Sequence, residues 1–98
     1  MKYTKEQIID FLRTQKDSFQ KEFKVKKIGI FGSYARSDAR EHSDIDIVVE
    51  LEKADLFHMI GIKQTVEDAF GSKVDIVRLR EGMNKSLKNR IEQDVIYV

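Results

Sequence analysis

Two aspartates stand one residue apart at the start of an apolar segment, in the sequence Asp44-Ile45-Asp46. Successive side chains of a β-strand point to opposite faces, so a strand here would project both carboxylates to the same side. Two adjacent negative charges raise each other's pKa unless a cation lies between them. Mg²⁺ prefers carboxylate oxygens and keeps open positions for water and phosphate. A metal site is therefore one interpretation of this pair. Taken without its context, such a pair more often consists of one aspartate that caps a turn and one that faces solvent.

A third aspartate, Asp75, lies inside the later apolar segment KVDIVRL. An ionised carboxylate in apolar surroundings is costly unless it is paired or bound to a metal. If this segment forms a strand beside the one that begins at Asp44 and Asp46, the three carboxylates form one cluster. The alternative is an aspartate on the solvent side of an edge strand.

Gly32 and Ser33 end an earlier apolar run and are followed by a polar loop. A glycine at the end of a strand lets the backbone approach a ligand closely. The N–H groups of the turn that follows, together with the Ser33 hydroxyl, suit an anion. Arg36 lies three residues further on, and its planar guanidinium matches a phosphate group. A Gly-Ser pair alone is weak evidence, because it is also a common tight-turn dipeptide.

The elements that must position these groups alternate between helix and strand. Thr4 and Gln7 form a capping-box pattern at the start of a first helix, and Asp55 and Gly71 are the expected cap and terminator of a second. The predicted strands are VKKIGIF, IDIVVEL, KVDIVRL and the terminal VIYV, and a last short helix is expected around residues 86–93. The predicted fold class is therefore α/β (α+β), with helices covering a small mixed sheet.

Length and composition limit the function classes. The 98 residues favour one domain over positions 1–98, and 18 Lys+Arg against 17 Asp+Glu give a net charge of +1. This charge does not support a protein that coats nucleic acid, so we expect no direct nucleic-acid binding. The chain has no cysteine, and its amino terminus lacks an apolar signal core. A cytoplasmic protein that does not contact a membrane is the resulting expectation.

Gly32-Ser33, ten intervening residues and Asp44-Ile45-Asp46 together resemble the signature of the DNA polymerase β-like nucleotidyltransferase superfamily. The later KVDIV segment resembles the strand that carries the third carboxylate in that superfamily. The short chain is similar to the minimal nucleotidyltransferases (MNT), which are commonly encoded beside helical HEPN-domain proteins as toxin–antitoxin pairs. Ser37 departs from the pattern, because relatives often have glycine there, and we expect serine to permit the same turn.

The resemblance implies a polymerase β-like fold and a metal-dependent reaction. Asp44, Asp46 and Asp75 are its implied ligands for two Mg²⁺ ions, with Asp75 also the implied catalytic base. Gly32 and Ser33 would hold the β- and γ-phosphates of ATP. The implied reaction is attack of an acceptor hydroxyl on the α-phosphorus, with release of pyrophosphate. Arg36 is a further phosphate contact in this interpretation.

The resemblance also implies an acceptor, a tyrosine of a cognate HEPN toxin that is silenced by adenylylation. The alternative is an antitoxin that neutralises the same partner by binding and occlusion, without catalysis. Either protein could assemble as a homo- or hetero-oligomer.

The segment RLREGMNKSLKNR near the end of the chain is strongly basic. It could face nucleotide phosphates, an acidic partner surface or RNA, although a solvated helix face is the commoner explanation. Its five basic residues are Arg78, Arg80, Lys85, Lys88 and Arg90.

Overall fold

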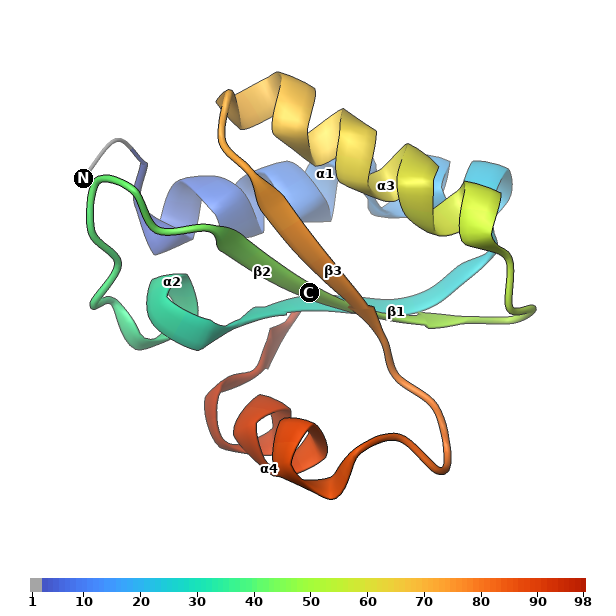
Figure 1. Ribbon diagram of the computed structural model, residues 1–98. Helices are drawn as coiled ribbons and strands as arrows, with labels where there is room; N and C mark the ends of the chain where they lie inside the picture. The colour runs from blue at the N-terminus through green and yellow to red at the C-terminus, as the bar shows by residue number, and fades with distance from the viewer. Residues whose placement is uncertain (1–2) are drawn as a thin grey trace.

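The computed structural model describes residues 3–98, which fold into a four-stranded mixed sheet with helices on both faces (Figure 1). The strand order is β3-β2-β1-β4, with β2 antiparallel to β1 and parallel to β3, and β4 antiparallel to β1. This mixed sheet confirms the predicted fold class. The elements are α1 (Lys5–Phe23), β1 (Val25–Phe31), α2 (Gly32–Arg36), β2 (Ile45–Leu51), α3 (Leu56–Phe70), β3 (Val74–Arg78), α4 (Lys85–Asp94) and β4 (Ile96–Tyr97).

Local capping sets the ends of α1 and α3 as predicted. The Thr4 side chain accepts from the N–H of Gln7 at 3.2 Å, and the Gln7 side chain accepts from the N–H of Thr4 at 2.9 Å. Asp55 caps α3 by accepting from the N–H groups of its first turn. Gly71 ends α3 in the left-handed conformation, with φ of 60°. Within residues 3–98 no helix is long and apolar enough to cross a membrane.

The C-terminal elements differ slightly from their predicted bounds. α4 begins one residue earlier than expected, because the Asn84 side chain caps it by accepting from the N–H of Leu87, and it ends one residue later, at Asp94. β4 is shorter than VIYV, although the N–H of Val98 still donates to the carbonyl of Ile28 at 3.0 Å. These differences leave the order of elements unchanged.

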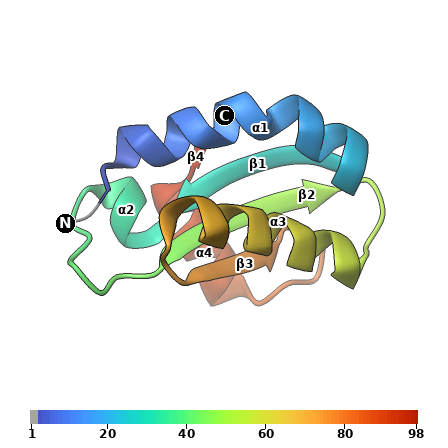
Figure 2. The same ribbon diagram turned by 90° about the horizontal axis from the view of Figure 1, so that it is seen from above.

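The two faces of the sheet are covered differently. α1 and α3 lie over one face and α4 lies under the other (Figures 1 and 2). Ile45, Ile47 and Val49 of β2 belong to the larger core cluster beneath α1 and α3. Val48 belongs to a smaller cluster that includes Ile91 of α4. The predicted alternation of β2 is confirmed, and Asp46 therefore lies on the α4 side of the sheet.

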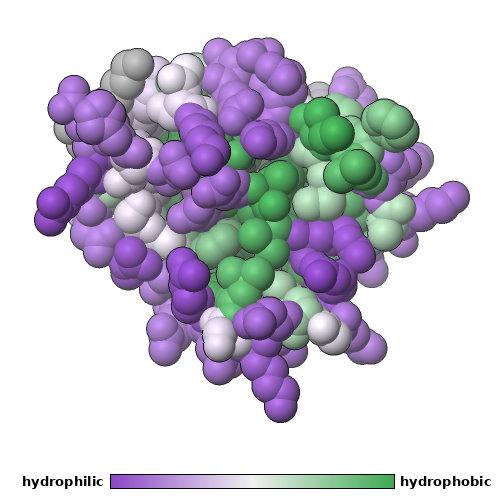
Figure 3. Space-filling model, viewed as in Figure 1, coloured by the Kyte–Doolittle hydropathy of each residue, from purple (hydrophilic) through white to green (hydrophobic). Residues whose placement is uncertain are grey.

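Three large apolar side chains at the start of α3 stay exposed. Leu56, Phe57 and Ile60 are 70%, 81% and 50% exposed, respectively. Figure 3 shows apolar surface over this end of α3 and across the sheet below it. Exposed apolar patches commonly mark contact sites for other proteins.

Candidate active site

Asp46 and Asp75 occupy the same register position on the neighbouring parallel strands β2 and β3. Neighbouring strands lie about 4.8 Å apart, and residues in register project to the same face. Both carboxylates therefore point to the α4 side of the sheet. Asp46 is half-buried, whereas Asp75 is exposed because β3 is the edge strand. Both sequence interpretations of Asp75 hold in part, since it is solvent-exposed on an edge strand and adjacent to Asp46.

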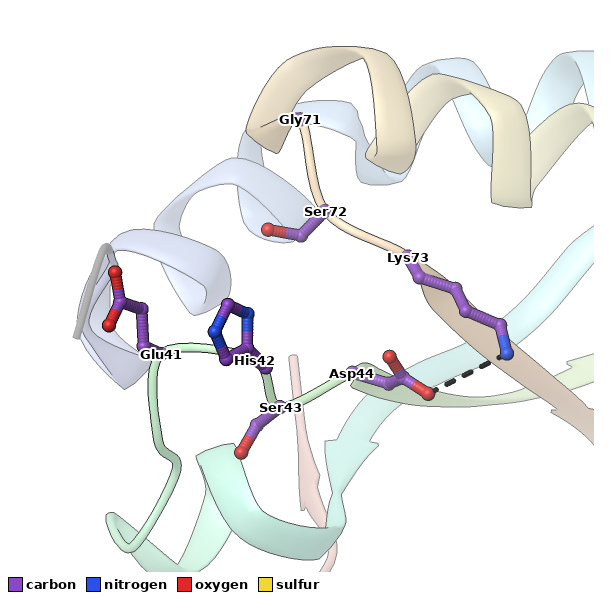
Figure 4. Close-up of a pocket in the computed structure, with 7 residues that line it drawn as sticks. All are labelled: Glu41, His42, Ser43, Asp44, Gly71, Ser72 and Lys73. Carbon is purple, nitrogen blue, oxygen red and sulfur yellow. Dashed lines mark ion pairs between the residues drawn. The ribbon is translucent and has the colours of Figure 1, made fainter.

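Asp44 lies just before β2, at the entrance to the strand. Its Oδ2 atom is 3.8 Å from Nζ of Lys73 (Figure 4). Both residues line an open pocket of about 510 Å³ between the loop before β2 and the turn after α3. The remaining lining residues are Glu41, His42, Ser43, Gly71 and Ser72. Asp44 thus forms an exposed ion pair with Lys73, and it lines this pocket at the entrance to β2.

The carboxyl group of Asp46 has a pKa raised to about 6. Burial is the largest cause, and the negative charges of Asp75 and Asp44 add to it. Arg90 and Arg36 act in the opposite direction but do not outweigh these causes. A carboxylate surrounded by more negative than positive charge favours an added cation.

Position 32, at the start of α2, requires glycine for two reasons, its backbone conformation and the lack of space for a side chain. Its φ of 73° lies in the left-handed region, which side chains other than glycine rarely adopt. A Cβ atom added there would overlap Oδ2 of Asp46. The backbone at Gly32 therefore lies directly against the Asp46 carboxylate, and the half-buried Ser33 follows it in the first turn. The structure thus brings the Gly-Ser turn and Asp46 together.

Arg36, at the end of α2, forms two ion pairs with aspartates. Its Nε donates to Asp38 at 3.0 Å, and its Nη1 donates to Asp94 of α4 at 2.8 Å. These hydrogen bonds raise the pKa of the guanidinium. The structure therefore places Arg36 between α2 and α4, and its contact with a phosphate stays a prediction.

The family described as Polymerase beta, Nucleotidyltransferase matches residues 6–98. The chain belongs to this family. The resemblance carried by the Gly-Ser turn and the paired aspartates is thereby confirmed, and the chain is a nucleotidyltransferase.

Two relatives of this nucleotidyltransferase have names that specify a protein acceptor. A provisionally named protein adenylyltransferase of Methanocaldococcus jannaschii is 43% identical over 93 residues, which cover 94% of this chain and 95% of that protein. The protein adenylyltransferase MntA of Thermococcus cleftensis is 33% identical over 96 residues, covering 97% and 96%. Each spans nearly the same length as this nucleotidyltransferase.

Two solved structures share its fold. A crystal structure of a toxin–antitoxin with AMP-PNP has a TM-score of 0.69 at 25% identity and covers 86% of this chain and 69% of that chain. A tri-AMPylated Shewanella oneidensis HEPN toxin in complex with MNT antitoxin has a TM-score of 0.62 at 23% identity, covering 90% and 69%. At 23% identity, the similarity to the Shewanella oneidensis complex shows only that the two chains share a fold.

The donor set of this nucleotidyltransferase suits Mg²⁺ in its chemistry. Asp46, Asp75 and Asp44 supply only carboxylate oxygens, and the pKa of Asp46 is raised by burial first and by the negative charges of Asp75 and Asp44 second. Across residues 3–98, however, no group of three or more acidic, histidine or cysteine side chains converges in metal-binding geometry. Asp44 instead contacts Lys73. Binding of Mg²⁺ by these three residues therefore stays a prediction.

Replacing Ser37 with glycine should raise the free energy of unfolding by about 0.5–1 kcal/mol. Ser37 ends α2 with φ of 64°, a conformation that costs an L-residue about 1–2 kcal/mol. The greater freedom of glycine in the unfolded chain offsets part of that gain. Urea unfolding measures the change. Ser18→Gly in the interior of α1 is the matched control and should lower stability, and a loss of stability in Ser37→Gly would contradict the assignment of strain.

The sequence assigned no role to Lys73 or Asp94, and it gave Arg90 no role of its own within the basic segment. Lys73 neutralises part of the Asp44 charge, Asp94 binds Arg36, and Arg90 lies close enough to Asp46 to affect its pKa. Arg90 was placed in a basic segment with several possible functions. The four-residue spacing of Arg90 and Asp94 could have indicated a shared helix face, but only packing shows what that face contacts.

Proposed function

We propose that this nucleotidyltransferase is a Mg²⁺-dependent protein adenylyltransferase that transfers AMP from ATP to a tyrosine of a HEPN toxin, and so acts as its antitoxin. The observation that carries the proposal is Asp46, a half-buried carboxylate in register with Asp75 and in direct contact with the Gly32 backbone. The names of its relatives, and of the solved complexes that share its fold, support a protein acceptor and a toxin–antitoxin pair.

In this proposal Asp44, Asp46 and Asp75 hold Mg²⁺. The ions would neutralise the charge of the triphosphate and of the departing pyrophosphate. The backbone N–H groups at Gly32 and Ser33 bind the β- and γ-phosphates and so orient the α-phosphorus.

We assign removal of the acceptor's proton to Asp75. As the exposed carboxylate on the edge strand, it can be reached by a hydroxyl carried on another protein. The acceptor oxygen bonds to the α-phosphorus while the bond from that phosphorus to the β-phosphate oxygen breaks. The hydroxyl proton passes to Asp75, and pyrophosphate leaves.

Binding without catalysis is the second candidate function. The exposed side chains Leu56, Phe57 and Ile60 favour it, because they offer an apolar contact surface that needs no nucleotide. Under this proposal the protein neutralises its partner by occlusion.

Labelling of the partner tests the proposed function. Purified protein is incubated with Mg²⁺, α-labelled ATP and a HEPN toxin as the candidate partner. We expect label on a partner tyrosine, and no label when EDTA removes the metal. A tight complex that never acquires label would overturn the proposed transfer and support occlusion.

A further inference from the structure

α4 lies on the face of the sheet that carries Asp46 and Asp75 (Figure 1). Its C-terminal end is tied to α2 by the ion pair of Arg36 with Asp94, at 2.8 Å. The Asp94 side chain is only 16% exposed, so this side of α4 faces α2 closely. The helix therefore lies beside the Gly-Ser turn and below the aspartates.

Arg90 precedes Asp94 by four residues, about one helical turn, so the two side chains lie on the same side of α4. The adjacent residue Ile91 is buried against Phe31 and Val48 of the sheet. Arg90 therefore lies on the side of α4 that Asp94 presents to α2. Its positive charge offsets part of the rise in the pKa of Asp46, which agrees with a position near that carboxyl group.

Arg90 and Arg36 differ in what they already contact. Arg36 is hydrogen-bonded to two aspartates, and it would have to leave them to bind a ligand. Arg90 is exposed and forms no ion pair with any other residue in the range 3–98. A guanidinium that never loses its proton, faces an anion site and has no protein counter-ion is suited to a phosphate.

We propose that Arg90 is a phosphate-binding residue that contacts the β,γ-diphosphate portion of the nucleoside triphosphate held at Gly32 and Ser33. This role rests on the proposed function and adds to it a residue from α4. Arg90 compensates negative charge that builds up on the departing pyrophosphate. Arg36 then acts as a positioning residue, which fixes α4 against α2 so that Arg90 reaches the phosphates.

Lys88 provides a matched control on the same helix. It is exposed and basic like Arg90, but two residues along a helix separate the side chains by about 200°. Lys88 lines a different pocket, of about 340 Å³, together with Lys27, Glu50 and Tyr97. Removing its charge therefore tests the general effect of a positive charge on α4.

The experiment measures binding of α,β-methylene ATP and of AMP, each with Mg²⁺, by calorimetry. Arg90→Ala should weaken binding of the triphosphate analogue about tenfold or more, the loss expected for a charge-assisted hydrogen bond. AMP affinity should change less than about twofold, since AMP lacks the phosphates concerned. Arg90→Lys should retain part of the affinity, and Lys88→Ala should match wild type.

Three results would overturn the role of Arg90. They are unchanged analogue binding in Arg90→Ala, an equal loss in Lys88→Ala, and an equal loss of AMP and analogue binding. Arg90→Gln repeats the measurement if the alanine variant unfolds. Failure of wild type to bind the analogue would instead overturn the proposed nucleotide site itself, and the Arg90 assignment with it.

Discussion

Replacing Asp46 with asparagine should lower the rate of nucleotide transfer by about 10³-fold or more while leaving the complex with the partner protein intact. The amide keeps the shape of the side chain but removes the charge that would hold Mg²⁺ beside the phosphates. Loss of several kcal/mol of transition-state stabilisation corresponds to a rate reduction of this size. Asp46 lies on the face opposite to α1 and α3, so the exposed apolar surface at the start of α3 is unaffected.

Single-turnover labelling of the partner with α-labelled ATP measures this rate, and size-exclusion chromatography measures the complex. Asp17→Asn is the matched control, because Asp17 is an exposed carboxylate on α1, remote from the site. An unchanged transfer rate in Asp46→Asn would exclude the carboxylate cluster as the reaction centre. Loss of the complex together with activity would show that the substitution disturbs docking.

The same substitution should stabilise the metal-free protein at neutral pH. The pKa of Asp46 is about 6 in the folded protein against an ordinary value of 3.8, so between these values the folded state keeps a proton that the unfolded state has released. Ionisation therefore destabilises the fold as pH rises from about 4 to about 6, and the full cost is present above that range. The difference between the two pKa values corresponds to about 3 kcal/mol in the free energy of unfolding. Because Asp46 is partly exposed, solvent screening reduces the expected effect to about 1 kcal/mol.

Urea unfolding of both proteins between pH 4 and pH 8 in EDTA tests this prediction. Asp46→Asn should be the more stable at pH 7, and its advantage should vanish near pH 4. When Mg²⁺ replaces EDTA, it should stabilise wild type and have little effect on the variant, since a ligand stabilises only the state that binds it. Equal stability at every pH would contradict the cost of ionising Asp46 through burial and neighbouring charge, and equal stabilisation by Mg²⁺ would contradict its role as a ligand.

Much of the fold follows from local patterns in the sequence. The alternation of IDIVVEL predicted which residues share a face of β2, and the capping box at Thr4 and the glycine at Gly71 predicted helix ends that the structure confirms. The Gly-Ser turn and the aspartate pair identified the family, because their spacing reflects a strand–turn–strand unit. Each of these features depends on residues close together in the chain.

What the sequence did not predict depends on contacts between distant segments. Arg36 pairs with Asp94, 58 residues away, and no local pattern indicates which carboxylate an arginine will meet. The exposure of Asp75 depends on β3 being at the edge of the sheet, which is a property of topology. Arg90 looked like any other residue of a basic segment, since its direction is set by the packing of α4 against α2.

The pairing of β1 with β4 has a consequence for how the protein matures. All three aspartates and the Gly-Ser turn are synthesised before α4 emerges, but α4 is held in place by β4, which pairs Gly29 and Ile30 with Tyr97 and Ile96. A nascent chain that has released β3 from the ribosome therefore carries the aspartates without the helix beneath them. Pairing between segments this far apart in the chain is slow, because the entropy of closing the loop opposes it. A chain stalled before α4 would therefore carry the aspartates and the Gly-Ser turn but lack Arg90, and a chain stalled between α4 and β4 would carry Arg90 on a helix not yet held against the sheet.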